Sequence, residues 1–402
     1  MALDVVSLRS HFPSLDSGIA HFDGPGGTQT PREVGEAVAQ TLTGPLSNRG
    51  SSVLSERNAD EAVGAFRSAM ADFLNADPRG IVYGRSATQL TYDFSRHLAK
   101  SWQPEGNVVV TRLDHDSNVR PWIQAAEARG LQVRWIDIDP ATAELDWASA
   151  EAAIDNGTAV VAFTGASNIL GTIPDIARVA ALAHAHGAQA YLDAVHYAAH
   201  ELVDLPALGV DFVVCSPYKF LGPHCGVLAA NPELLETITP DKLLPSTNVV
   251  PERFEFGTLP YELMAGVTAA VDFLASLEPG AGATRRARLE SAYGAIHEHE
   301  GRLRTRIEEG LASFGDAVVL HSRAGRRTPT LLVTMPGRRT SDASAYLAAR
   351  DVLAPAGSFY GYEPFRALGV DDVGALRMGL APYNDDRDVD RLLEGLAAFL
   401  GR

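Results

Sequence analysis

Lysine is scarce in this chain of 402 residues, with only Lys100, Lys219 and Lys242 among 34 basic residues. Arginine supplies the rest, and it does not lose its proton, so it forms no imine. Cysteine is scarcer still, since Cys215 and Cys225 are the only two. This number excludes a disulfide framework and a cysteine-based metal site. Any chemistry that needs a nucleophilic amine therefore depends on one of three lysines, and we expect no metal.

Long apolar runs and excess positive charge are also absent. No run of eighteen apolar residues is available to cross a membrane, and residues 1–9 lack the basic-then-apolar pattern of a signal peptide. The net charge is −16, whereas a nucleic-acid partner requires a basic surface. We therefore expect a cytoplasmic protein that binds neither nucleic acid nor membrane. The length favours two domains rather than one.

Strand and helix patterns alternate from Ile81 onward. This alternation predicts an α/β fold with a mainly parallel sheet and helices on both faces. We expect an N-terminal segment (1–18) packed with the small domain, a large domain (19–262) and a smaller α+β C-terminal domain (263–402). The strands expected in the large domain are 81–83, 108–111, 133–136, 159–164, 189–192 and 227–230.

Lys219 lies in a loop after a buried strand that we expect to end near Val214. Pro217 predicts that this loop is ordered and not helical. The apolar neighbours Phe220 and Leu221 favour burial, which lowers the pKa of an amine. This setting is typical of a lysine that forms Schiff bases. The alternative is an ordinary surface lysine.

Polar residues follow the ends of several predicted strands, where a parallel sheet forms its ligand crevice. They are Thr88, His115, Asn168, Asp193 and Lys219. The turn at 86–88 joins a strand to a helix, and free N–H groups at such a turn bind phosphate. Ser86 and Thr88 also fit simple helix caps.

An imine-forming lysine, a carboxylate and a phosphate-binding turn together suggest pyridoxal 5′-phosphate (PLP). Asp193 would keep the ring nitrogen protonated, so that the ring acts as an electron sink. A helix cap or a solvent-exposed histidine is the plainer explanation of each residue alone, but their joint placement favours PLP. The other contacts we expect are Ser86, Ala87, Thr88 and Ser216 to the phosphate, Asn168 to the ring hydroxyl and His115 to the ring face.

Longer motifs resemble the class V aminotransferase group of fold-type I PLP-dependent enzymes. The resemblance is closest to cysteine-desulfurase-like and isopenicillin N epimerase-like proteins, and it runs from about Phe22 to the last predicted helix. The stretches that carry it are 114–122, 167–172, 192–196, 215–219, 253–258 and 382–384, together with Arg377.

The resemblance implies a homodimer and a role for each matching residue. Lys219 would hold PLP and act as acid and base, Asp193 would pair with the ring nitrogen, and His115 would stack on the ring. Arg377 would clamp the substrate α-carboxylate, a bidentate task that suits arginine. Further implied contacts are Thr88, Asn168, His196, Ser216 and Tyr218 to the cofactor, Gly257 and Thr258 to the partner subunit's cofactor, and Asn118 and Tyr360 to the substrate.

The sequence departs from the desulfurases where they carry a persulfide-forming cysteine. Residues 357–362 read Gly-Ser-Phe-Tyr-Gly-Tyr, and neither Cys215 nor Cys225 occupies the sulfur-acceptor place. We therefore expect a lyase that cleaves the C–S bond of an S-substituted cysteine by β-elimination, with Tyr360 and Tyr362 shaping a larger pocket. The alternatives are decarboxylation-dependent oxidative deamination, transamination, epimerisation, cysteine desulfuration and a PLP-binding scaffold without catalysis.

Overall fold

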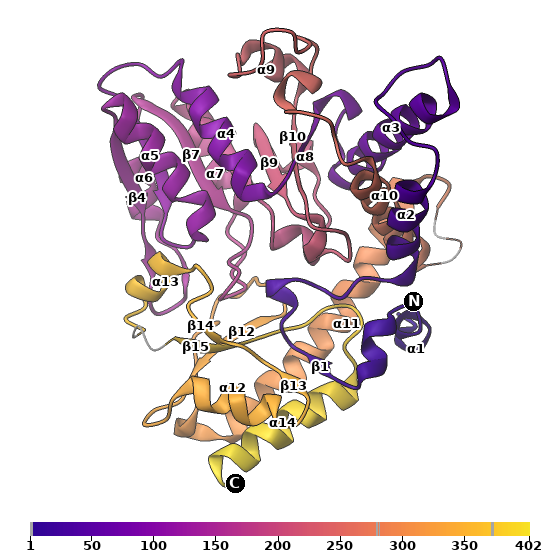
Figure 1. The fold of residues 1–402 in the computed structure, drawn as a ribbon. Helices are drawn as coiled ribbons and strands as arrows, with labels where there is room; N and C mark the ends of the chain where they lie inside the picture. Colours follow the sequence, from indigo (N-terminus) through magenta and orange to yellow (C-terminus); the bar gives the residue numbers. More distant parts are fainter. Residues whose placement is uncertain (1–2, 279, 281, 371–373) are drawn as a thin grey trace.

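The computed structural model describes residues 3–278, 280, 282–370 and 374–402. Two sheets dominate it, a large one above and a smaller one below in Figure 1. The large sheet has seven strands in the order β2-β10-β9-β8-β7-β3-β4. Their bounds are β2 (Ile81–Gly84), β3 (Asn107–Thr111), β4 (Gln132–Ile136), β7 (Thr158–Thr164), β8 (Gln189–Asp193), β9 (Phe212–Cys215) and β10 (Gly226–Ala230).

Five neighbouring strands, from β9 to β4, are parallel, which confirms the predicted mainly parallel sheet. Strand β10 continues the sheet as expected but runs antiparallel to both β9 and β2. Only the loop that contains Lys219 joins β9 to β10, whereas a parallel return needs a crossover, usually a helix. The lysine loop therefore turns the chain back on itself at the carboxyl end of β9.

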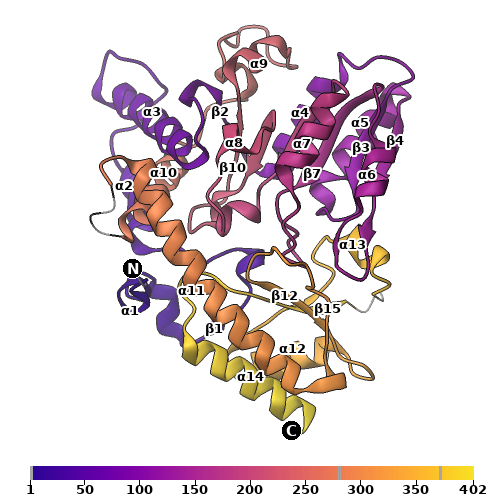
Figure 2. The same ribbon diagram turned by 180° about the vertical axis from the view of Figure 1, so that it is seen from behind.

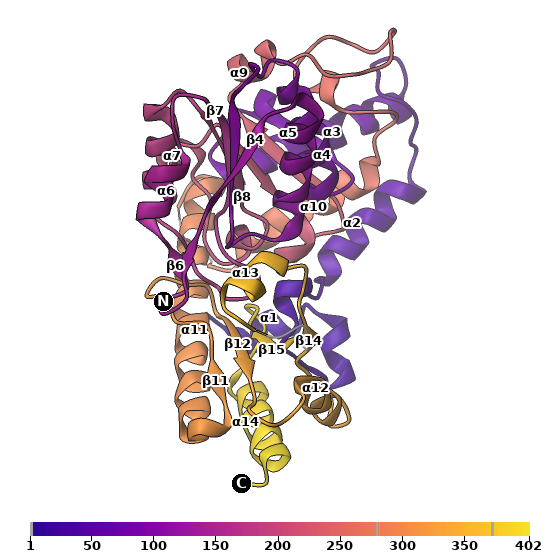
Figure 3. The ribbon, with the colours of Figure 1, turned by 90° about the vertical axis from the view of Figure 1, so that its left-hand side faces the viewer.

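Helices cover both faces of this sheet (Figures 2 and 3). Val108 and Val110 pack with the core under α4 (Ala87–Ala99) and α5 (Arg120–Arg129), whereas Val109 packs with the opposite core. Strands buried on both faces consist of nearly continuous apolar runs, which is why they could be predicted. On the other face lie α6 (Trp147–Ala153), α7 (Ile176–Ala185) and α8 (Leu205–Leu208).

Helix α7 begins after Pro174 and Asp175. The carboxylate of Asp175 accepts a hydrogen bond from Arg178 N at 3.1 Å. Asp175 is therefore the N-cap, and the helix starts at Ile176. An aspartate side chain satisfies a free N–H of the first turn, which a proline side chain does not.

The smaller sheet is antiparallel, with the order β11-β12-β15-β14. Its strands are β11 (Val319–Leu320), β12 (Thr330–Thr334), β14 (Ala356–Gly357) and β15 (Ala375–Gly379). The helices of this part are α11 (Arg285–Ser313), α12 (Thr340–Ala348), α13 (Tyr362–Ala367) and α14 (Asp386–Leu400). The division at 18 and 262 stays a prediction, since α10 (Tyr261–Ser276) packs against both α2 (Arg32–Thr43) and α11.

The remaining elements extend the two layers at their edges. Strand β1 (Ala20–His21) pairs in parallel with β13 (Val352–Leu353), so a segment near the N-terminus joins the lower part. No described helix is long and apolar enough to span a membrane. The other elements are α1 (Val5–Arg9), α2 (Arg32–Thr43), α3 (Leu54–Leu74), α9 (Pro232–Thr237), β5 (Ile138–Asp139) and β6 (Glu144–Leu145).

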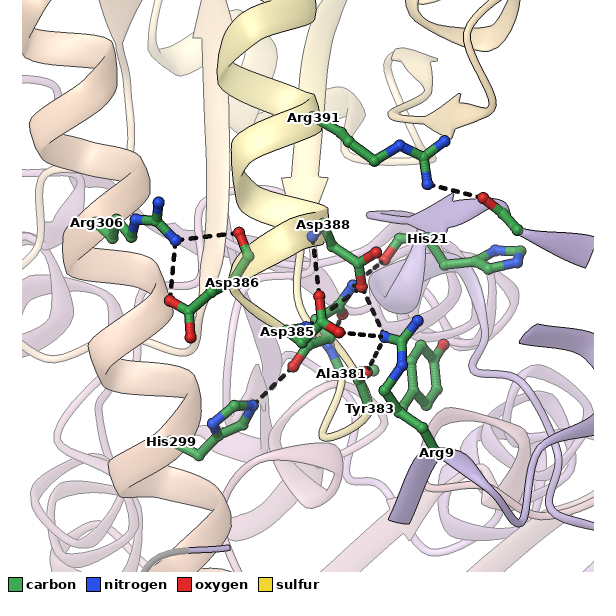
Figure 4. Close-up of polar contacts among 12 residues, drawn as sticks. Arg9, His21, His299, Arg306, Ala381, Tyr383, Asp385, Asp386, Asp388 and Arg391 are labelled. Carbon is green, nitrogen blue, oxygen red and sulfur yellow. Dashed lines mark hydrogen bonds and ion pairs between the residues drawn. The ribbon is translucent and has the colours of Figure 1, made fainter. Parts of the chain in front are cut away.

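Arg9 ties the first helix to the last one (Figure 4). Its guanidinium donates to the carbonyl oxygen of Tyr383 at 2.7 Å and to Oδ2 of Asp388 at 2.9 Å. The same carboxylate of Asp388 completes a capping box at the start of α14 with Asp385. Two residues earlier, Asp386 forms ion pairs with Arg302 and Arg306 of α11 on the solvent side.

Asp388 and Asp386 provide a matched pair for a stability measurement. The side chain of Asp388 is 6% exposed and that of Asp386 is 52% exposed. We expect Asp388→Ala to lower the free energy of unfolding by roughly 2 kcal/mol, because it removes a cap and takes the nearest carboxylate away from the partly buried guanidinium of Arg9. Asp386→Ala should lower it by about 0.5 kcal/mol, since exposed ion pairs contribute little. Urea unfolding followed by circular dichroism measures both, and equal losses would contradict the expectation.

Candidate active site

A cavity of about 670 Å³ lies at the carboxyl ends of β7, β8 and β9, between the two sheets. Residues from both sheets' parts of the molecule line this cavity. Helix α4 and the loop of Lys219 lie on one side, and β15 and the loop before α13 lie on the other. The predicted site residues that the structure brings together here are Ser86, Ala87, Thr88, His115, Asn168, Asp193, His196, Ser216, Tyr218, Lys219, Tyr360 and Arg377.

Three predicted site residues lie outside this cavity. Gly257 and Thr258 are exposed in the loop before α10, and their contact with a partner subunit stays a prediction. Asn118 is fully buried, and its amide donates to Asp114 Oδ1 at 2.7 Å while its oxygen accepts from Trp122 Nε1 at 3.1 Å. Both ends of its side chain are engaged, so Asn118 supports the loop that carries His115, and its contact with a substrate stays a prediction.

Lys219 ends a 3₁₀ helix of one turn, Pro217–Lys219, in the loop that was predicted to be non-helical, because a proline fits the first position of a helix. It is 8% exposed. Its Nζ donates to the carbonyl oxygen of Pro25, so the amine points into the cavity beside the loop at 24–27. Burial and, to a smaller extent, the positive charge of Arg377 together lower the pKa of Lys219 to about 7, against the opposing effect of the carboxylate of Asp193. A large fraction of this amine is therefore neutral near pH 7, which is the form that attacks an aldehyde or takes a proton.

Asp193 lies at the end of β8, next to the lysine loop in the sheet. Its Oδ1 accepts a hydrogen bond from Val195 N at 2.8 Å. Burial raises the pKa of Asp193 to about 6, against the lowering effects of that hydrogen bond and of Lys219. A buried carboxylate of this kind keeps its charge best beside a cation, which is what a protonated pyridine nitrogen would supply.

The turn after β2 provides the N-terminus of α4 to the cavity. Ser86 caps this helix, since its hydroxyl accepts from Gln89 N at 3.0 Å. The first N–H groups of a helix have no partner within it and attract anions. Gly226 in β10 packs directly against this turn, and a Cβ atom there would lie 2.5 Å from Ala87 N and closer still to Ser86 C. The small residue thus lets the turn reach its position.

Two histidines present neutral rings to the cavity. Burial lowers the pKa of His115 to about 4, and Nδ1 of this ring bonds to the Ser117 hydroxyl at 2.8 Å. Burial also lowers the pKa of His196 well below its usual value. Nε2 of His196 bonds to the hydroxyls of Thr328 and Thr330 at 3.0 and 2.9 Å. Its Nδ1 has no partner among the described residues, so a polar ligand can use it.

Arg377 reaches the cavity from β15 of the smaller sheet. Its Nη1 donates to the carbonyl oxygen of Asn168 at 3.1 Å, and its guanidinium lies 3.9 Å from the centre of the Phe359 ring. Burial lowers the pKa of Arg377 to about 10, so the group is charged at neutral pH. Gly26 lies against the guanidinium, where a Cβ would be 3.3 Å from Nη2. The glycines at 24–27 therefore allow the backbone of this loop to lie close to the guanidinium of Arg377.

Several lining residues were not predicted as site residues. Pro25 and Gly26 belong to a glycine-rich loop, and Asp116, Ser117 and Arg120 lie within the motif 114–122. Val195 lies within the motif 192–196, and Phe359 lies within the segment 357–362. These stretches could have identified them. The remaining ones gave no signal in the sequence, because their role depends on contacts with distant segments: Tyr92, Gln124 and Ala166.

The donor set fits PLP, with an amine, a buried carboxylate, a helix N-terminus and unpartnered polar atoms around one cavity. The two-sheet architecture with this arrangement defines a fold-type I PLP-dependent enzyme. The chain belongs to the class V aminotransferase family, whose model (Aminotransferase class-V) matches residues 20–392.

Relatives with similar sequences and structures cover nearly the whole chain. It is 30% identical to the uncharacterized protein MT3887 of Mycobacterium tuberculosis, over 99% of this chain and all of that protein. It is 28% identical to the cysteine desulfurase of Dickeya dadantii, over 97% of this chain and 95% of that protein. The crystal structure of the cysteine desulfurase CsdA from Escherichia coli superposes with a TM-score of 0.88 at 25% identity, covering 100% of this chain and 99% of that one.

Lys219 should be the residue that becomes covalently attached to PLP. Borohydride reduction of the PLP-loaded protein, followed by peptide mass spectrometry, should locate the label on Lys219 and not on Lys100 or Lys242. In the protein stripped of cofactor, the initial rate of attachment should rise as the pH increases through about 7, because the pKa of Lys219 lies there. Label on either of the other lysines would remove Lys219 from this role.

Gly226→Ala should weaken PLP binding, because the added Cβ displaces the backbone at Ser86 and Ala87. We expect the dissociation constant for PLP to rise about tenfold or more, which corresponds to about 1.4 kcal/mol. Titration of the stripped protein, followed by cofactor absorbance, measures it. The control is Gly64→Ala in α3, where a Cβ meets nothing within 4 Å and binding should not change. An unchanged affinity in a folded Gly226→Ala variant would contradict the assignment of the turn.

Proposed function

We propose that the chain is a PLP-dependent lyase that cleaves the C–S bond of an S-substituted cysteine by β-elimination. The proposal depends on one observation: Phe359 and Tyr360 form a wall of the cavity, and this wall contains no thiol. Relatives named as cysteine desulfurases favour a substrate derived from cysteine. A thiol in this wall is what a persulfide-forming enzyme would require, whereas an eliminating enzyme needs none.

The two cysteines are unsuited to accept sulfur. Cys215 ends β9 and Cys225 precedes β10, and their side chains are 0% and 1% exposed. Burial raises the pKa of the Cys215 thiol well above its usual value and that of Cys225 to about 12. The thiolate is the form that attacks sulfur, so both groups are inert near neutral pH. Neither residue lines the cavity.

In the proposed reaction, the side chains position the substrate and move one proton. Arg377 would hold the α-carboxylate, since its guanidinium is buried and charged. PLP, when bound, would supply an electron sink for the carbon that loses its proton. Lys219 Nζ would take the α-proton, and the sulfur would leave the β-carbon as a thiolate. Asp193 would hold the proton on the ring nitrogen, and His115 would keep the ring in place.

The expected cofactor contacts complete this proposal. Ser86, Ala87, Thr88 and Ser216 would bind the phosphate, with Tyr218 beside them. Asn168 and His196 would face the ring oxygen, where Asn168 Oδ1 and His196 Nδ1 have no partner among the described residues. Gly257 and Thr258 would complete the site of the partner subunit in a homodimer.

Product analysis separates the proposed elimination from the alternatives. An S-substituted cysteine should give a free thiol, pyruvate and ammonia in equal amounts, measured by mass spectrometry and a coupled pyruvate assay. Cys215→Ser and Cys225→Ser should each keep most of this activity, because neither thiol reaches the substrate.

Other outcomes would overturn the proposed reaction. A persulfide on either cysteine, together with loss of activity on its replacement, would indicate desulfuration. Carbon dioxide without pyruvate would indicate decarboxylation, and a D-amino acid or a keto acid that keeps its sulfur would indicate epimerisation or transamination.

A further inference from the structure

A second hollow, of about 480 Å³, adjoins the cavity of Lys219 on the side of the small domain. It shares Asp116, Arg120, Phe359 and Tyr360 with that cavity, so the two spaces meet at these four side chains. Beyond them, the hollow is lined by Ser358 and Tyr362. A substrate whose carboxylate is held at Arg377 therefore has room for a large substituent that extends past the Phe359 ring.

The segment that forms this wall is held in one conformation. Phe359 and Tyr360 both adopt left-handed backbone angles, with φ of 53° and 56°, which non-glycine residues keep only where contacts impose them. Asn168 Nδ2 donates to the carbonyl oxygen of Phe359 at 3.0 Å, and Asp116 N donates to that of Tyr360 at 2.9 Å. The wall is thus fixed from the large domain on both sides.

Glu363 anchors the other end of the segment. It lies in the first turn of α13, is 4% exposed, and pairs with Arg112 at 2.8 Å and with Arg120 at 2.9 Å. Helix α13 lies at the junction of the two parts of the molecule in all orientations (Figures 1 and 3). The rings of Phe359, Tyr360 and Tyr362 therefore belong to a segment whose position is fixed by contacts at residues 359, 360 and 363.

The charges at this hollow are already paired. Arg120 is bound by Asp116 at 2.8 Å as well as by Glu363, so it has little capacity for an anionic substituent. A cationic substituent would meet guanidinium groups at the rings, since Arg377 lies on Phe359 and Arg120 lies 5.8 Å from the centre of Tyr362. Tyr360 lies 5.4 Å from the His115 ring, tilted by 39°. What remains for a ligand is uncharged aromatic surface.

We propose that this hollow binds the sulfur substituent of the substrate and selects an uncharged aromatic group, such as benzyl, over a charged one. The proposal rests on the proposed function, because it assigns the hollow to the group that leaves with the sulfur. Offset and edge-to-face contacts between rings favour such a group, and water leaves the apolar surface when it binds.

Competing substrates test the selectivity. With the PLP-loaded enzyme, kcat/KM for S-benzyl-L-cysteine should exceed that for S-methyl-L-cysteine by about tenfold or more, which is the effect of one well-packed ring. S-carboxymethyl-L-cysteine and S-(2-aminoethyl)-L-cysteine should both fall below S-benzyl-L-cysteine by at least the same factor. Preference for either charged substrate would overturn the proposal and assign the hollow to an ion.

Tyr360→Ala should lower the benzyl-to-methyl ratio of kcat/KM about tenfold, mainly through KM, and Tyr360→Phe should restore it, because the ring and not the hydroxyl makes the contact. The matched control is Tyr346→Ala in α12, where the ring packs on Phe399 and under Arg350, away from the cavity. Its ratio should equal that of the parent enzyme. An unchanged ratio in a folded Tyr360→Ala variant would overturn the assignment of the ring.

A binding measurement distinguishes failure of the subsite from failure of the proposed reaction. Dissociation constants for the four S-substituted cysteines come from the absorbance change of the bound cofactor, whether or not product forms. A benzyl preference in binding without thiol release would retain the subsite and refute the elimination. Thiol release from all four at equal kcat/KM and equal affinity would retain the elimination and refute the subsite.

Discussion

Burial of ionisable groups at the carboxyl edge of the large sheet is the constraint on which this site depends. The strands are apolar on both faces, so side chains at their ends lie in a poorly solvated space that disfavours charge. Burial lowers the pKa of Lys219 to about 7 and of His115 to about 4, and raises that of Asp193 to about 6. The same effect therefore favours a neutral amine at Lys219 and makes the charge of Asp193 depend on a neighbouring cation.

The second constraint is that two sheets must meet around this edge. Lys219 and Asp193 come from the large sheet, whereas Arg377 comes from the smaller one. Hydrogen bonds across the junction hold them together, from Asn168 to Phe359 and from Arg377 back to Asn168. His196 is fixed in the same way by the hydroxyls of Thr328 and Thr330, at and just before the start of β12. The site thus exists only in the assembled chain.

The close structural similarity to CsdA extends over the whole chain, at a TM-score of 0.88, so it describes the scaffold that both share. A scaffold of this kind supports several outcomes from one cofactor, and the residues around the substrate decide among them. In this chain the wall beside Arg377 consists of aromatic rings on a segment fixed by Asn168, Asp116 and Glu363. Because this wall has no thiol to accept sulfur, we favour β-elimination, in which a thiol leaves, over desulfuration, in which a sulfur atom is transferred to a cysteine.

Local patterns in the sequence determined much of this protein. Apolar runs predicted the strands, because a segment that is buried on both faces consists mostly of apolar residues. Apolar neighbours and the rarity of lysine together singled out Lys219. Strand ends predicted that Thr88, His115, Asn168 and Asp193 would gather in one crevice, as they do. The resemblance added Arg377 and His196, which local patterns alone did not assign.

Only the tertiary structure decided the features that depend on pairing between distant segments. It made β10 run antiparallel to β9 and brought Thr328 and Thr330 to His196. It also placed Phe359 and Tyr360 in left-handed conformations that their own residue types disfavour. Each of these features results from contacts between residues far apart in the chain, and such contacts cannot be predicted from a local sequence pattern. Together they determine the shape of the cavity.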